Sequence, residues 1–138
     1  MENLYSPFSK MDCEIDDKYG TVVNCFAHMI SHNKIDVNKF EVWMKYGAIG
    51  GDISWGIEKW NEDSKDIHGI DEEYTGYLFY IGKEEHMQSE YDHHKILTKE
   101  QIKPFLNSII SYYLKKDIEN NTGVHNLITL AKEYGFID

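Results

Sequence analysis

The sequence contains no arginine, and this absence limits the partners that the protein can bind. All 14 basic residues are lysines, and 24 aspartates and glutamates outnumber them, which gives a formal net charge of -10. A nucleic-acid-binding protein needs a cationic face for the phosphate backbone. We therefore expect no nucleic-acid partner, and we expect any charged partner to be basic.

Cysteine and long apolar runs are also scarce. The two cysteines are Cys13 and Cys25, and the first residues show no basic region followed by an apolar run. Two free thiols are therefore expected, with Cys25 in the core of a helix. No stretch approaches the roughly 20 apolar residues of a membrane span. These absences predict a cytoplasmic protein that does not contact a membrane.

The residues that are present favour one folded unit. The chain has 138 residues, of which 41% are hydrophobic and 14% aromatic, and this is enough apolar material for one core. We expect a single α+β domain over residues 1–138, in which a small antiparallel sheet packs against helices. Two of these helices are expected to be C-terminal.

The first elements are predicted from caps and periodicity. Thr21 can cap a helix over residues 22–30, which is expected to end near residues 32–33. Apolar and polar residues then alternate over residues 40–46, and this period of two favours a half-buried strand. A helix that begins at Asp36 is the competing interpretation.

Strand patterns follow in the middle of the chain. The glycines of residues 47–51 are expected to form a turn that leads into a strand over residues 53–58, as in a hairpin. Residues 61–76 are polar and are expected to form a long connection. Residues 77–81 are apolar on both faces, which predicts a central strand, and a further strand is expected over residues 90–96.

The C-terminal third carries helix signals. Thr98 and Gln101 form a capping box, while Pro104 is expected either to delay the start of this helix or to kink it. Asn121 or Thr122 is expected to cap a last helix. Gly135, with an aromatic residue after it, predicts a Schellman ending for that helix.

The excess negative charge lies in one section of the chain. Residues 52–92 carry 12 acids and three lysines, for a net of -9, whereas the sections before and after it have nets of -2 and +1. Five aromatic residues lie among these acids: Trp55, Trp60, Tyr74, Tyr77 and Tyr80. A charge run of this kind often only keeps a protein soluble. The alternative is a protein-binding surface, because such surfaces use aromatic anchors surrounded by polar groups.

Residue clusters that could carry chemistry give only weak signals. The densest group of potential metal ligands consists of His86, Glu90, Asp92, His93 and His94. Its spacing matches no known metal site, so we expect no metal and no other cofactor. Cys25 and His28 are three positions apart, but a Cys-His nucleophile also needs an orienting group from elsewhere in the fold. We therefore expect a protein that is not an enzyme.

The order of segments from about residue 20 to 136 resembles a known family. The strand Gly76-Tyr77-Leu78-Phe79-Tyr80-Ile81 is followed by an acidic stretch and by Leu97-Thr98-Lys99-Glu100-Gln101-Ile102, which opens a helix. This outline resembles the immunity proteins of bacterial polymorphic toxin systems, in particular those of contact-dependent growth inhibition. The resemblance implies that the protein binds and neutralises a cognate basic nuclease toxin, with a ribonuclease as the expected case.

Charge complementarity leads to the same expectation, because a nuclease presents a cationic cleft to its substrate. The expected partner-binding residues are Asp52, Glu58, Trp60, Glu62, Asp63, Asp66, Asp71, Glu72, Glu73, Tyr74 and Tyr77. Two alternatives stay open. The first is a non-catalytic adaptor domain that binds another basic protein, and the second is a small metal-dependent hydrolase that uses residues 86–94.

Overall fold

The computed structural model describes residues 20–31, 34–51, 55–60, 73–81, 93–116 and 121–138. These residues form the expected α+β fold, with an antiparallel sheet and two C-terminal helices. In chain order the elements are α1 (Gly20–Ala27), β1 (Ile30–Ser31), β2 (Lys34–Ile35), α2 (Val37–Tyr46), β3 (Ala48–Gly51), β4 (Trp55–Lys59), β5 (Tyr77–Ile81), β6 (His93–Leu97), α5 (Lys99–Lys116) and α6 (Asn121–Glu133).

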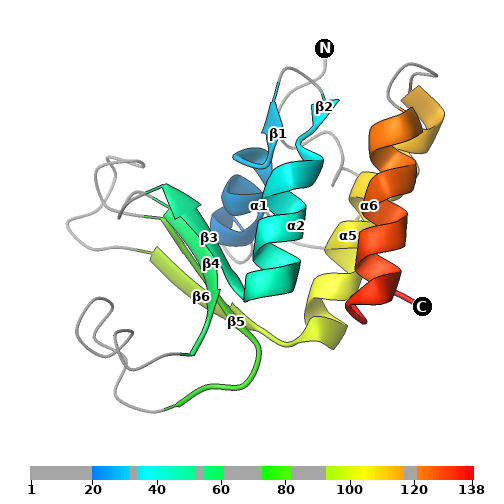
Figure 1. The fold of residues 1–138 in the computed structure, drawn as a ribbon. Coiled ribbons are helices and arrows are strands. Elements are labelled where there is room, and N and C mark those ends of the chain that lie inside the picture. The colour runs from blue at the N-terminus through cyan, green and yellow to red at the C-terminus, as the bar shows by residue number, and fades with distance from the viewer. Residues whose placement is uncertain (1–19, 32–33, 52–54, 61–72, 82–92, 117–120) are drawn as a thin grey trace.

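The main sheet is a meander in the order β3-β4-β5-β6, and each strand is antiparallel to its neighbour. Figure 1 shows α1 and α2 on one side of this sheet, with α5 and α6 side by side next to them. Helix α1 lies against β4, β5 and β6, whereas α2 contacts β3 and α6. All five side chains of β5 are buried, which confirms the predicted central strand.

Aromatic side chains fill the core between the sheet and the helices. Phe26 of α1 lies 5.5 Å from Phe79 of β5 and 5.9 Å from Trp43 of α2, measured between ring centroids. The Trp43 ring in turn lies 4.8 Å from that of Phe136, which follows α6. Edge-to-face and tilted pairs of this kind are favourable packing geometries. The C-terminal residues are therefore part of the same core as the sheet.

Helix α2 replaces the strand predicted over residues 40–46, so the favoured interpretation was wrong and the competing one was correct. The Asp36 side chain accepts a hydrogen bond of 3.4 Å from the backbone three residues on, as an N-cap does. Gly47 ends the helix at φ 86°, and its N–H donates to the Trp43 carbonyl at 2.8 Å. The buried side chains of α2 are those of Phe40, Trp43 and Met44, which follow helical spacing.

Other boundaries near the N-terminus also differ from prediction. The predicted turn at residues 47–51 is largely strand β3, which forms a hairpin with β4. Thr21 lies inside α1 rather than before it, and α1 ends at Ala27 instead of near residues 32–33. The chain leaves the helix early because Ile30 and Ser31 pair with β2.

The C-terminal helix signals are confirmed except for two details. The Thr98 N–H donates to Gln101 Oε1 at 3.0 Å, and the Gln101 N–H donates to Thr98 Oγ1 at 3.2 Å, as in a capping box. Helix α5 begins at Lys99 and continues through Pro104, so a later start is wrong. The predicted caps, Asn121 and Thr122, lie within α6.

The end of α6 has the predicted Schellman geometry. Gly135 has φ 77°, and its N–H donates to the Lys132 carbonyl at 3.2 Å. The next N–H, of Phe136, donates to the Ala131 carbonyl at 2.8 Å. The reversal turns the Phe136 ring into the core. Among the described helices, none is long and apolar enough to cross a bilayer.

Candidate functional site

The described members of the predicted binding set gather at one end of the main sheet, where β4 ends and β5 begins. They are Glu58, Trp60, Glu73, Tyr74 and Tyr77. The register that pairs Lys59 with Tyr77 holds these two strand ends side by side. The other members, Asp52, Glu62, Asp63, Asp66, Asp71 and Glu72, lie outside the described residues.

Trp60 and Tyr74 form an aromatic pair between these strand ends. Their ring centroids are 5.6 Å apart and the rings are inclined at 86°, so the contact is edge-to-face. The Tyr74 hydroxyl donates to the backbone carbonyl of Glu58 at 3.1 Å. Both side chains are partly exposed. The pair therefore joins the end of β4 to the approach to β5, and part of both rings stays exposed.

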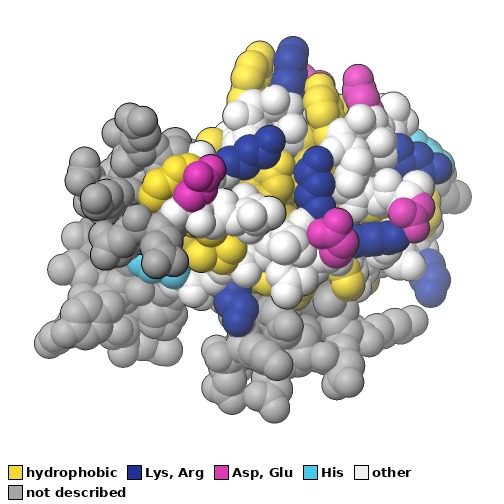
Figure 2. Space-filling model, turned by 90° about the horizontal axis from the view of Figure 1, so that it is seen from below, with side chains coloured by type: hydrophobic (Ala, Val, Ile, Leu, Met, Phe, Trp, Pro, Cys, Tyr) yellow, Lys and Arg dark blue, Asp and Glu magenta, His cyan; other side chains and the backbone are white. Residues whose placement is uncertain are grey.

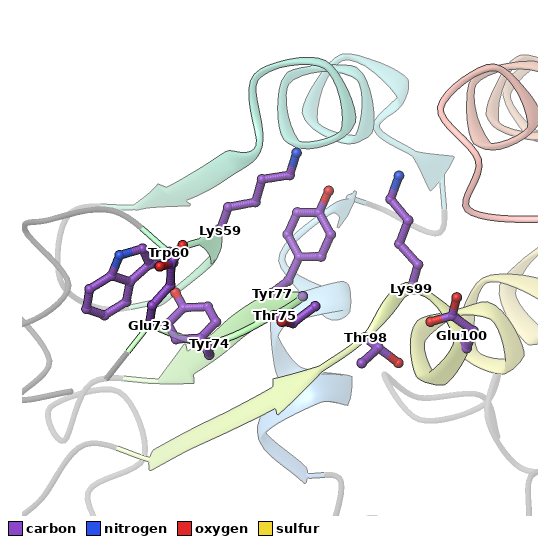
Figure 3. A pocket seen from close by; sticks show the side chains of 10 residues that line it. Lys59, Trp60, Glu73, Tyr74, Thr75, Tyr77, Thr98, Lys99 and Glu100 are labelled. Atoms are coloured by element: carbon purple, nitrogen blue, oxygen red, sulfur yellow. The ribbon is translucent and has the colours of Figure 1, made fainter. Parts of the chain in front are cut away.

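A pocket of about 410 Å³ adjoins this aromatic pair. It is lined by Lys59 and Trp60, by residues 73–77 and by residues 98–100 at the start of α5. Figure 3 shows that these side chains come from β4, from the approach to β5 and from α5. The pocket thus forms where three separate segments of the chain meet.

Tyr77 forms part of the core and only borders this pocket. Its side chain is 2% exposed, and its ring lies 5.6 Å from that of Trp43 and 5.5 Å from that of Phe136. Burial raises the pKa of the Tyr77 phenol above its usual value, so the hydroxyl stays protonated at neutral pH. Little of this ring is left for an aromatic contact with a partner, in contrast to Trp60 and Tyr74.

Two lysines at the pocket are absent from the set predicted from sequence. Lys59 Nζ lies 5.8 Å from the centroid of the Tyr77 ring. Lys99 Nζ donates to the Tyr134 carbonyl at 2.8 Å and lies 4.8 Å from the Phe136 ring centroid. Because Lys99 joins the start of α5 to the end of α6, no local sequence pattern reports its position. The site is thus mixed in charge rather than purely acidic.

Lysines outnumber carboxylates in the described residues, and the reverse holds in the rest of the chain. The described residues contain ten lysines and seven carboxylates, whereas the rest of the chain contains four lysines and 17 carboxylates. Figure 2 shows lysines and carboxylates interspersed over one face of the described part. The excess negative charge of the protein therefore belongs to the segments between and before the described elements.

Cys25 of the Cys25–His28 pair does not have the properties of a nucleophile. Cys25 Sγ is buried and lies 3.4 Å from the carbonyl oxygens of Gly56 and Tyr80. Burial raises the pKa of the Cys25 thiol to about 12, so it carries almost no thiolate at neutral pH. The His28 ring stacks on that of Trp55, with 4.8 Å between centroids and an angle of 7°. Cys25 is a core residue, as predicted.

The predicted group of possible metal ligands over residues 86–94 is described only in part. His86, Glu90 and Asp92 lie outside the described residues. His93 and His94 belong to β6, and the His94 side chain is exposed. Within the part of the chain that the structure describes, no three His, Cys, Asp or Glu side chains lie close enough to hold a metal ion.

Comparisons of the chain with protein-family models, with curated proteins and with solved structures give no match. The geometry and charge of the residues are therefore the basis for assigning a function.

Proposed function

We propose that the protein is an immunity-type inhibitor, which binds a basic nuclease domain and neutralises it. The observation that carries this proposal is the Trp60–Tyr74 pair, which closes the two ends of residues 61–73. That segment contains six acids and a single lysine: Glu62, Asp63, Asp66, Asp71, Glu72, Glu73 and Lys65. The acidic residues are thus bounded in the chain by two aromatic residues that contact each other.

This combination suits a partner with a cationic cleft. Negative charge opposite a positive surface raises the rate of encounter and selects against acidic partners. Partly exposed Trp and Tyr side chains are the residue types that most often dominate the binding energy of an interface. The acids would therefore govern association, and Trp60 with Tyr74 would govern the lifetime of the complex.

The direct test is coexpression with the product of the gene next to that of this protein, followed by purification of the complex. The expected result is a basic partner with nuclease activity when free and none in the complex. A complex that retains nuclease activity would contradict inhibition and would favour the adaptor alternative. Hydrolysis by the isolated protein that is lost in a His86→Ala/His93→Ala variant would favour the hydrolase.

Charge reversal tests the role of the acidic segment. In Glu62→Lys/Asp63→Lys, we expect the association rate at low salt to fall at least about tenfold and to depend less on salt. The matched variant Glu41→Lys/Glu133→Lys makes the same change in net charge at two exposed positions on α2 and α6. If stopped-flow rates fall equally in both variants, only the net charge matters and the proposed surface is wrong.

A further inference from the structure

The Tyr77 hydroxyl has no hydrogen-bond partner among the described residues, although its side chain is 2% exposed. The oxygen is not sealed inside the protein, because Trp43 Nε1 is the only fully buried polar side-chain atom without a partner among the described residues, and Tyr77 also lines the pocket. Buried polar groups nearly always have a partner from the protein or the solvent. A sheltered phenol whose hydroxyl is still accessible beside a pocket is therefore a donor that a ligand can use.

Two lysine side chains flank this hydroxyl. Figure 3 shows the Lys59 and Lys99 side chains on either side of Tyr77, with both ammonium ends on the side toward which the hydroxyl points. Lys99 Nζ gives one hydrogen bond to the Tyr134 carbonyl, and an ammonium group has three donors. The first turn of α5 also lines the pocket and adds the partial positive charge of a helix N-terminus.

We propose that this pocket binds a small ligand whose anionic oxygen group, a carboxylate or a phosphate, accepts a hydrogen bond from Tyr77 and pairs with Lys59 and Lys99. The Trp60–Tyr74 pair borders the same pocket and gives an aromatic wall for a planar ring of that ligand. A volume of about 410 Å³ is in the range of small-molecule sites.

The two carboxylates at the pocket restrict where the anionic group can bind. Glu73 lies beside Trp60, and Glu100 lies beside Lys99 at the start of α5 (Figure 3). Both are exposed, as Lys59 is, so water screens these three charges alike, but only the two lysine ammonium groups lie on the side toward which the Tyr77 hydroxyl points (Figure 3). The anionic group is therefore assigned to the space between the two lysines. This site does not depend on the proposed immunity function.

The test measures binding of four probes to the isolated protein by calorimetry or NMR titration. Inorganic phosphate and acetate carry the two candidate anions alone, whereas phenyl phosphate and benzoate add a ring. We expect a probe with a ring to bind more tightly than the corresponding anion alone. The preferred anion, phosphate or carboxylate, identifies the class of ligand.

Variants then assign the binding to the named groups. Tyr77→Phe removes only the hydroxyl, and we expect binding to weaken about tenfold or more, because a hydrogen bond to a charged group is lost. Tyr46→Phe, at a side chain that is 72% exposed on α2, is the matched control and should bind as the wild type does. Lys59→Met and Lys99→Met should weaken binding, whereas Lys115→Met at the far end of α5 should not.

Three results would overturn this assignment: no probe binds, Tyr77→Phe binds as tightly as wild type, or Lys115→Met weakens binding as much as Lys99→Met does. The last result would show a general attraction of anions to lysines. None of these measurements uses a protein partner, so their outcome is separate from that of the nuclease-inhibition test.

Discussion

At the scale of single residues, burial changes the chemistry of Cys25. The thiol sits beneath the strand pair β4–β5, where the carbonyl oxygens of Gly56 and Tyr80 lie 3.4 Å away. Burial raises its pKa from 9.0 to about 12, since a thiolate would lose its hydration there. The folded state therefore holds a proton that the unfolded chain releases above pH 9.

This difference predicts that the protein loses stability in alkali. The contribution of the protonated Cys25 thiol is fully present below pH 9 and is lost as the pH rises toward 12. Between pH 8.5 and 10.5 the loss should be roughly 2 kcal/mol in the free energy of unfolding.

Urea titrations at these two pH values measure the loss. In Cys25→Ser, which has no thiol to ionise, the fall with pH should be smaller by that amount. If the free energy of unfolding falls equally with pH in wild type and in Cys25→Ser, the pKa of Cys25 is the same in the folded and unfolded states, and the prediction is wrong.

At the scale of elements, α5 holds a proline within the helix, where proline is unfavourable. Pro104 is the sixth residue of the helix Lys99–Lys116 and is exposed. A proline at this position cannot donate to the Glu100 carbonyl, and its ring crowds the preceding turn. Packing of Ile102, Phe105 and Leu106 in the core keeps the segment helical in spite of this cost.

Pro104→Ala is therefore expected to stabilise the protein by about 1–3 kcal/mol, because it restores a backbone hydrogen bond and removes the clash. Thermal and urea unfolding give the measurement. Asn107→Ala, at an exposed position of the same helix, is the control and should gain less than about 0.7 kcal/mol. A loss of stability in Pro104→Ala would mean that the proline shapes the helix for a contact with another part of the chain.

Element types were predictable where caps and periodicity agreed. The capping box at Thr98 and the reversal at Gly135 are local signals, and both were predicted correctly. Residues 40–46 were assigned wrongly because their apolar residues fit both periods, and only the caps at Asp36 and Gly47 favour the helix. Both caps are local signals in the sequence, and together they specify a helix over these residues.

The candidate site was less predictable than the fold. Trp60 and Tyr74 were predicted as binding residues because they lie among the acids of residues 52–92. The pairing of Lys59 and Lys99 across Tyr77 depends on how α5 and α6 pack beside the sheet, and no spacing in the sequence encodes that. Tertiary packing also placed Tyr77 in the core, although its position among the acids had suggested an exposed anchor.

At the scale of the whole molecule, the excess negative charge and the described helices and strands belong to different sections of the chain. The described residues have three more lysines than carboxylates, and the others have 13 more carboxylates than lysines. Attraction between the two parts stabilises the fold, but repulsion among the acids opposes it. With a formal net charge of -10, repulsion should be the larger effect.

We therefore expect sodium chloride to stabilise the protein, because salt screens repulsion between exposed charges. From about 20 to 200 mM, the free energy of unfolding should rise by roughly 1 kcal/mol, which corresponds to a few degrees in Tm.

Glu62→Gln/Asp63→Asn should be more stable than wild type at low salt and should gain less from added salt. Glu41→Gln/Glu133→Gln removes the same charge from the described residues, in which lysines outnumber carboxylates. This variant should keep most of the gain in stability that added salt produces. A Tm that falls as salt is added would contradict this prediction. It would mean that attraction between the acidic segments and the lysines of the described residues outweighs repulsion, and neutralising Glu62 and Asp63 would then destabilise the protein.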